Sequence, residues 1–251
     1  MNPPKIAVVI LNWNGAALLE QFLPSVCAYS EQAVIYVADN ASTDDSVSVV
    51  QSKFPQVKII QNTQNLGFAG GYNQALKNVP EEILALVNSD IEVTENWLQP
   101  ILEIFENEPQ TGMVQPKILD FKNKSMFEYA GAAGGYIDQF GFPFCRGRLF
   151  DTLEPDQGQY DERTEIFWAS GACMLTRKKI YEELDGLAAI ELHGEHHLRT
   201  GELIVYTSVD SVVQFAGHED RISQPGLEDA CAAARIELRG PDAVGRVIAR
   251  P

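Results

Sequence analysis

Hydrophobic and polar positions alternate in blocks over the first ninety residues. Four short apolar runs, rich in β-branched residues, lie at residues 6–11, 33–38, 57–60 and 83–87. Continuous apolar runs of this length are typical of strands buried on both faces of a parallel sheet. Apolar residues at helical spacing fill the intervals between the runs. This alternation predicts a βαβ series, and therefore an α/β fold built on an open parallel sheet.

Three helices are predicted between these strands. The first has apolar residues at helical spacing over 18–26, with Pro24 inside it as a potential kink. The second is expected to begin around Asp44, capped by the hydroxyl of Ser42 or Thr43. The third follows a glycine-rich segment and leads into the fourth strand.

Polar side chains follow three of the four strands at their carboxyl ends. They are Asn12 with Asn14, Asp39, and Asn88 with Asp90. Open α/β sheets bind ligands at this edge, so we expect Asn12, Asp39 and Asp90 to converge on one cleft. A carboxylate such as that of Asp90, facing a diphosphate, is a suitable ligand for Mg²⁺ or Mn²⁺. The alternative is that the segment beginning at Asp39 only starts a helix.

Three glycines, Gly67, Gly70 and Gly71, follow the third strand. They allow the backbone to approach a ligand closely, and the start of the next helix favours an anion; the alternative is a simple tight turn. The sequence contains neither a GxxxxGK[ST] phosphate loop nor a GxGxxG motif. The sequence therefore lacks the main signal of phosphate-loop ATPases and that of simple dinucleotide-binding enzymes.

The net charge of −16 argues against a nucleic-acid partner, because a phosphate backbone would be repelled. A phosphorylated ligand stays compatible, since a bound divalent cation can outweigh the mean field. The four cysteines form no CxxC pair, which indicates reduced thiols and a cytosolic protein. We expect a cytoplasmic location, which includes a peripheral position at the inner membrane surface. No apolar run approaches the roughly 20 residues of a membrane helix, so we expect no transmembrane segment.

The composition changes near residue 186. Residues 1–186 hold all nine lysines and all three tryptophans, whereas all four histidines lie in residues 187–251. These asymmetries favour two segments of different origin, with one domain and a biased tail as the alternative.

Five segments resemble, in order, the signatures of family 2 glycosyltransferases, and most closely their rhamnosyltransferase-like branch. They are 9–15 (VILNWNG), 37–44 (VADNASTD), 65–73 (NLGFAGGYN), 86–90 (LVNSD) and 168–175 (WASGACML). The resemblance implies a GT-A (Rossmann-like) nucleotide-sugar-binding domain. It also implies a UDP- or dTDP-linked sugar donor, Mg²⁺ or Mn²⁺, and transfer with inversion to a glycan or lipid-linked acceptor.

Residue roles also follow from this resemblance. Asp39 would hold the nucleobase and Asp90 the metal ion, with Asn88 standing where many relatives have aspartate. The remaining nucleotide-binding residues would be Asn12, Asn14, Asn65, Gly67 and Gly70.

The resemblance stops after Gly186. The family continues with aromatic residues and a Glu-Asp pair, whose aspartate is the expected general base. No such pair in that context follows here, and the Glu219-Asp220 dipeptide after His218 has different neighbours. The catalytic base is therefore unassigned, and the domain over 1–186 is interpreted as truncated.

The segment 187–251 resembles a different family, phosphopentomutase, in the part that corresponds to its cap domain. The resemblance lies in 194–201 (GEHHLRTG), 204–214 (IVYTSVDSVVQ) and 244–251 (VGRVIARP). It implies that a ribose phosphate would lie near Ser208, Asp210, Val212, Arg246 and Ile248. His193 and His197 stand at i, i+4, but a metal site there is the weaker interpretation.

We expect 187–251 to form a small α/β unit of its own, loosely attached, with helices over 188–199 and 227–238 and strands over 203–206 and 244–248. The resemblance over 1–186 thus implies a metal-assisted inverting glycosyltransferase, and the missing base motif leads us to expect impaired turnover. The alternatives are a nucleotide-sugar-binding module without turnover and a sugar-phosphate-binding fragment related to phosphopentomutase.

Overall fold

The computed structural model describes residues 5–129, 131–140, 142–149, 151–187, 201–215 and 247–249. For the last two segments only the course of the backbone is described. The predicted helices over 188–199 and 227–238 lie outside the described residues.

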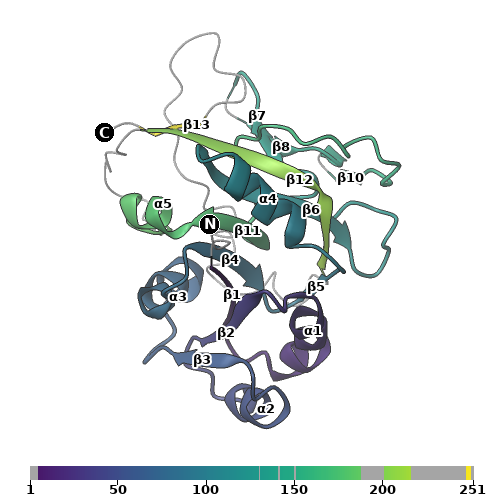
Figure 1. The fold of residues 1–251 in the computed structure, drawn as a ribbon. Coiled ribbons are helices and arrows are strands. Elements are labelled where there is room, and N and C mark those ends of the chain that lie inside the picture. The colour runs from purple at the N-terminus through teal and green to yellow at the C-terminus, as the bar shows by residue number, and fades with distance from the viewer. Residues whose placement is uncertain are drawn as a thin grey trace.

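A nine-stranded mixed sheet forms the centre of the fold (Figure 1). Its strands run in the order β13-β12-β6-β11-β4-β1-β2-β3, and β5 pairs with β12. The bounds are β1 Ile6–Asn12, β2 Ala33–Asp39, β3 Lys58–Gln61, β4 Ile83–Asn88, β5 Ile91–Val93, β6 Thr111–Asp120, β11 Cys173–Arg177, β12 Gly201–Phe215 and β13 Val247–Ala249.

The α/β class is confirmed, and β3, β2, β1 and β4 form the parallel part that the apolar runs predict. The sheet as a whole is not parallel, because β11 runs antiparallel to both β4 and β6. The sequence pattern could not reveal this, since a strand buried on both faces is apolar throughout whichever way its neighbour runs.

Helices cover both faces of the sheet. They are α1 Ala16–Tyr29, α2 Ser46–Lys53, α3 Gly67–Ala75, α4 Gln99–Asn107 and α5 Lys178–Glu183, with a 3₁₀ turn at Leu76–Asn78. Because alternate strand residues face opposite sides, Val8 and Ile10 pack with α1, α2 and α4, whereas Ala7 and Val9 pack with α3 and α5. The α1 helix continues through Pro24. No helix among the described residues is long and apolar enough to cross a membrane.

A second, four-stranded antiparallel sheet follows β6, in the order β10-β9-β8-β7. Its strands are β7 Gly135–Ile137, β8 Pro143–Cys145, β9 Arg148–Leu149 and β10 Thr152–Leu153. One face packs on a buried cluster that includes Phe127, Cys145 and Trp168. Gly135 is required there, because a Cβ at this position would lie 2.0 Å from the Trp168 indole.

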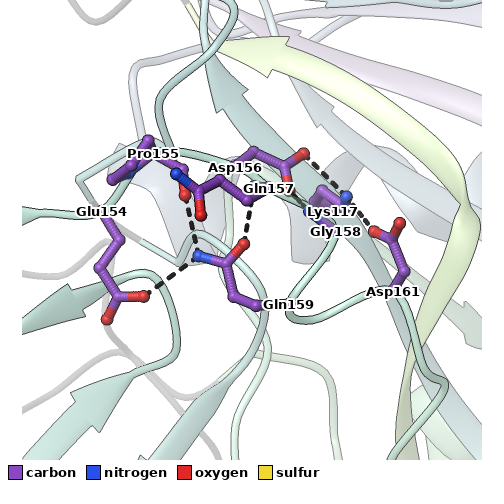
Figure 2. A network of polar contacts seen from close by, with 8 residues as sticks. All are labelled: Lys117, Glu154, Pro155, Asp156, Gln157, Gly158, Gln159 and Asp161. Atoms are coloured by element: carbon purple, nitrogen blue, oxygen red, sulfur yellow. Dashed lines mark hydrogen bonds and ion pairs between the residues drawn. The ribbon is translucent and has the colours of Figure 1, made fainter.

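A partly buried ion-pair network ties the loop after β10 to β6 (Figure 2). The Lys117 ammonium lies 2.8 Å from the Asp156 carboxylate and also pairs with Asp161. Gln159 completes the loop by donating to the Glu154 carboxylate and to a backbone carbonyl (Figure 2). The Lys117 side chain is 8% exposed and that of Asp156 15%, so neither charge is well hydrated without the other.

The strands described after residue 200, β12 and β13, belong to the nine-stranded sheet, which differs from the expectation of an independent unit. The strand predicted over 203–206 is part of the much longer β12, which runs parallel to β6 and antiparallel to β5. Of the strand predicted over 244–248, only residues 247 and 248 are described, and they lie in β13, which pairs with the start of β12. The free edge of β6 accepts the backbone of β12, a long-range pairing that has no local sequence signal.

We predict that Lys117→Met lowers the free energy of unfolding by about 3 kcal/mol, because it leaves a poorly hydrated carboxylate without its counter-ion. Lys124→Met is the matched control, since Lys124 pairs with Glu92 but is 54% exposed, and it should cost less than about 1 kcal/mol. Urea unfolding at neutral pH measures both. Equal costs for the two variants would contradict the prediction.

The ion pairs of Lys117 also make the stability of the fold depend on pH. Burial lowers the pKa of Lys117, but hydrogen bonds to Asp156 and Asp161 outweigh it and leave the pKa above its ordinary value. A raised lysine pKa stabilises the fold fully below the unfolded-state pKa and loses that contribution as the pH rises through the folded-state pKa. The difference in the free energy of unfolding between wild type and Lys117→Met should therefore be constant around neutral pH and shrink in strongly alkaline solution.

Candidate functional site

The ends of β1 and β2 place two polar side chains side by side. Asn12 and Asp39 are direct partners in the parallel ladder, and the Asn12 amide lies 3.4 Å from the Asp39 carboxylate. Their exposed fractions are 1% and 2%. The same amide group donates to the Ser42 hydroxyl at 3.2 Å. The structure therefore brings these two predicted residues together, both buried at the carboxyl edge of the sheet.

The Asn12 amide oxygen is a buried acceptor that has no hydrogen-bond donor among the described residues. Reversing the amide would turn this oxygen toward the Asp39 carboxylate, which only accepts, and would remove the contact between the amide nitrogen and that carboxylate. Gly15 makes room for the oxygen, because a Cβ at that position would lie 2.4 Å from it. An unsatisfied buried acceptor is costly, so this one is suited to receive a donor from a ligand.

Asn14 holds the loop after β1 in place. Its backbone has φ 51°, in the left-handed region that asparagine tolerates better than most residues. Its N–H donates to the Ser42 hydroxyl at 2.9 Å, and its side-chain oxygen accepts from the Thr43 N–H at 2.7 Å. Predicted as a nucleotide-binding residue, Asn14 is exposed here and joins the loops after β1 and β2.

Asp44 caps two helices with one carboxylate. One oxygen accepts from the N–H of Ala16, the first residue of α1, and the other from the N–H of Ser46, the first residue of α2, both at 3.0 Å. The prediction that Ser42 or Thr43 caps α2 is wrong, because the hydroxyl of Ser42 is used by the loop after β1.

The titration of Asp44 reflects these bonds. Partial burial raises the pKa of Asp44, but hydrogen bonds from Ser46 and from the Ala16 N–H outweigh burial and leave the pKa below its ordinary value.

A cluster of asparagines fixes the loop before α3. The side chain of Asn40 donates to Asn65 at 2.7 Å and to the Gly67 carbonyl at 3.0 Å. Its oxygen accepts from Asn62 at 3.1 Å and from the Leu66 N–H at 3.2 Å. Asn40 and Asn62 were not predicted as site residues, and the only signal for Asn40 is its position directly after Asp39.

The glycines of this loop have different roles. Gly67 has φ +70°, and no heavy atom lies within 4 Å of a Cβ placed on it, so its conformation requires glycine and the space beside it is open. A Cβ on Gly70 would lie 2.9 Å from Leu66, and one on Gly71 would lie 2.9 Å from Leu11. Local packing alone accounts for a glycine at position 70, and the contact of Gly70 with the nucleotide stays a prediction.

Asp90 follows β4, the strand on the other side of β1. The N–H of Asn88 donates to the Ala172 carbonyl at 2.9 Å, which joins this strand end to the segment before β11. The Ser89 hydroxyl lies 3.8 Å from a Cβ built on Gly15, so the turn after β4 borders the Asn12 loop. Asp90 itself is fully buried.

The described residues contain no group of three or more His, Cys, Asp and Glu side chains placed to hold a metal ion. Magnesium and manganese sites built from one or two carboxylates and substrate phosphates need no such group. Asp90 with the Asn88 side chain offers oxygen donors of this kind at a strand end, so the donor chemistry fits a metal shared with a diphosphate.

The sequence model of glycosyl transferase family 2 matches residues 7–185. The chain belongs to this family. The match spans the β1, β2 and β4 ends and their loops, and it stops where the composition changes.

Solved glycosyltransferases share the fold of this family 2 chain at 16% identity. The mannosyltransferase PcManGT from Pyrobaculum calidifontis, in complex with GDP-Man and Mn²⁺, superposes with a TM-score of 0.57 over 88% of this chain and 59% of its own. GalNAc-T7 with UDP, GalNAc and Mn²⁺ superposes with a TM-score of 0.66 over 89% of this chain and 45% of its own. TarS from S. aureus, in complex with UDP-GlcNAc, superposes with a TM-score of 0.57 over 88% of this chain and 61% of its own.

Part of the family 2 chain also matches phosphopentomutases. Those from Symbiobacterium thermophilum and Carboxydothermus hydrogenoformans are 56% and 58% identical over 66 residues. The match covers 26% of this chain and 17% of each relative, so the chain spans about a sixth of the length of these relatives.

The predicted sugar-phosphate residues of the tail do not all lie together. Ser208, Asp210 and Val212 lie on β12, around an irregularity where the register against β6 shifts. Ile248 lies on β13 opposite Glu202, six residues from Ser208, or roughly 20 Å along an extended strand. Arg246, the histidines and the Glu219-Asp220 pair lie outside the described residues.

We predict that Asp44→Ala destabilises the family 2 domain by about 2 kcal/mol, since each lost helix cap costs about 1 kcal/mol. Asp45→Ala is the control: Asp45 is exposed and makes no side-chain cap, so it should change stability by less than about 0.5 kcal/mol. Because the pKa of Asp44 is lowered, its contribution is present above the unfolded-state pKa and is lost as the pH falls through the folded-state value. Denaturant titrations at neutral and acidic pH test this, and an equal effect of both variants would refute it.

Proposed function

We propose that this family 2 glycosyltransferase binds a nucleoside-diphosphate sugar at the carboxyl edge of β1, β2 and β4. We further propose that it transfers the sugar, with inversion and metal assistance, to an acceptor hydroxyl on a glycan or a lipid-linked glycan. The family match over 7–185 and the fold shared with solved glycosyltransferases support the reaction class.

The buried Asn12–Asp39 pair carries the proposal. One Asp39 oxygen accepts from the Ser42 N–H at 3.1 Å, whereas the other has, among the described residues, only the long 3.4 Å contact with Asn12. A carboxylate held in this way can accept a further N–H. Uracil and thymine carry a ring N3–H at the position where cytosine has an acceptor, so this geometry favours UDP- or dTDP-linked donors over CDP-linked ones.

The diphosphate would lie beside the turn after β4. Asp90 would hold Mg²⁺ or Mn²⁺, and the ion would offset the negative charge that develops on the leaving diphosphate. Asn88 supplies an amide where a second carboxylate would otherwise stand, so the protein contributes one negative charge from this motif. The solved PcManGT and GalNAc-T7 complexes that share the fold contain Mn²⁺, which supports testing this ion first.

Transfer also needs a base that removes the proton of the acceptor hydroxyl, a contribution worth roughly 10²–10⁴ in rate. We assign none among the described residues. Donor binding and sugar transfer are therefore separate steps to test. Donor binding without transfer would favour a nucleotide-sugar-binding module.

Asp39→Asn tests the nucleobase contact. We expect UDP affinity to fall about tenfold or more, because a hydrogen bond to a charged acceptor is lost. We expect CDP affinity to rise, since the asparagine amide can donate to the cytosine N3. Isothermal calorimetry with UDP, dTDP, CDP and GDP measures both changes. Asp45→Asn is the control and should alter neither affinity. A uniform loss for all four nucleotides would indicate a structural role and contradict the assignment.

Asp90→Asn tests the metal. The variant keeps the size of a fully buried side chain and removes its charge. We expect wild-type UDP binding to be tighter with Mn²⁺ than with EDTA, and this gain to disappear in the variant while metal-free affinity is kept. A full Mn²⁺ gain in Asp90→Asn would exclude Asp90 as the metal ligand.

A further inference from the structure

A strand from beyond the family 2 match lies at the edge of the candidate site. The family model ends at residue 185, whereas β12 spans Gly201–Phe215 and belongs to the segment that resembles phosphopentomutase. On one side β12 runs parallel to β6, and its last three residues also run antiparallel to β5 (Figure 1). Residues 213–215 therefore lie between two strands of the family 2 domain.

The strand β5 depends on β12 for its place in the sheet. It begins at Ile91, directly after Asp90. Among the described residues, β5 pairs with β12 and with no other strand. The register sets Ile91 opposite Phe215. The course of the backbone immediately after Asp90 is thus set by β12.

The backbone before Asp90 is anchored from another side. Asn88 is the last residue of β4, and its N–H donates to the Ala172 carbonyl at 2.9 Å. Asp90 therefore lies two residues after one anchor and one residue before the other. Groups that orient a metal ligand change metal affinity by roughly 10–100-fold, so both anchors bear on the proposed metal site.

The direction of one N–H group shows which residue of β12 bonds to β5. The Val93 N–H donates to the Ser25 hydroxyl of α1 at 3.4 Å, so it points away from β12. Hydrogen-bonded and non-hydrogen-bonded pairs alternate along an antiparallel ladder. The pair that contains Val93 is thus non-hydrogen-bonded, and the next pair, Glu92 with Gln214, is the one that exchanges N–H and carbonyl bonds.

The backbone of Gln214 is directed to β5 alone. The N–H and carbonyl groups of successive residues in an extended strand point to opposite edges. With Gln214 directed to β5, Val213 and Phe215 are directed to β6. A proline at position 214 would therefore remove a bond to β5 and leave the N–H groups that face β6.

Packing against α1 is the other support of β5. Ile91 and Val93 are 0% and 1% exposed and belong to the core cluster that includes Leu19 and Val26 of α1. Apolar burial is non-directional. It holds β5 against the helix, whereas the ladder with β12 also fixes which residues stand opposite one another.

We propose that β12 is a positioning strand for the metal-binding turn. Its pairing with β5 fixes the direction in which Asp90 presents its carboxylate to Mg²⁺ or Mn²⁺. This role rests on the proposed function of Asp90 as the metal ligand. The segment that resembles phosphopentomutase thus serves the donor site of this family 2 protein through its backbone.

Gln214→Pro in the full chain tests the proposal. Calorimetry of UDP binding at increasing Mn²⁺ concentration gives the concentration needed for half of the gain in UDP affinity. We expect the variant to need about tenfold more Mn²⁺ than the wild type. Its UDP affinity in EDTA should be unchanged, because the Asn12–Asp39 pair is not altered. Amide hydrogen exchange at Glu92, read by NMR, should be faster in the variant, since the partner strand is displaced.

Val209→Pro is the matched control. Residues 209–211 have no partner on β6, because the register shifts between Ser208 and Val212. Proline is tolerated at such irregularities of a strand. The control should keep the wild-type Mn²⁺ response and the slow exchange at Glu92.

Three results would overturn the positioning role of β12. They are a wild-type Mn²⁺ response in Gln214→Pro, unchanged exchange at Glu92 in that variant, and an equal loss in Val209→Pro. A wild type without any Mn²⁺ gain, or a full gain in Asp90→Asn, would instead refute the metal role of Asp90, and the positioning role with it.

A second variant covers the case in which Gln214→Pro does not unfold cooperatively. Glycine inside a strand weakens it without removing the N–H, so Gln214→Gly should perturb the ladder more mildly. We expect its Mn²⁺ response to weaken as exchange at Glu92 becomes faster. Faster exchange with an unaltered Mn²⁺ response would show that burial under α1 is sufficient and would contradict the proposal.

Discussion

The candidate site depends on the in-register parallel pairing of β1 with β2 and β4. This pairing sets Asn12 beside Asp39 and Leu11 beside Asn88, so the three loops that follow leave the sheet at one edge. The strands are buried on both faces, and Ala7, Val8 and Val9 are completely inaccessible. A shift of one residue in register would exchange the two faces of β1 and misplace every polar side chain that follows.

Side chains, rather than main-chain ladders, hold the loops beyond the strand ends. Asp44 bonds the starts of α1 and α2, and Asn40 bonds the loop before α3. Asn and Asp can replace backbone partners in this way because their short polar side chains reach nearby N–H and carbonyl groups. The loops are therefore ordered before any ligand arrives, which lowers the entropy that binding must offset.

The sequence was most informative where the pattern is local. The apolar runs located β1 to β4, and the polar residues directly after them located Asn12 and Asp39. The double cap by Asp44 could not be predicted, because the N–H of Ala16 is 28 residues away in the chain. The four-stranded sheet was missed since its strands have only two or three residues, too few to show a period of two. The pairing of β12 with β6 depends on a tertiary edge that composition does not encode.

The central claim is that the Asp39 carboxylate accepts a hydrogen bond from the nucleobase of a bound donor, at the edge formed by β1, β2 and β4. A crystal structure of the chain with UDP and Mn²⁺ tests it most directly. The account predicts that the uracil N3 lies within hydrogen-bond distance of the Asp39 carboxylate, with the ring over the loop after β1. Uracil bound elsewhere would contradict it, for instance in the cavity of about 330 Å³ lined by Asn73, Lys178 and Tyr181 between α3 and α5.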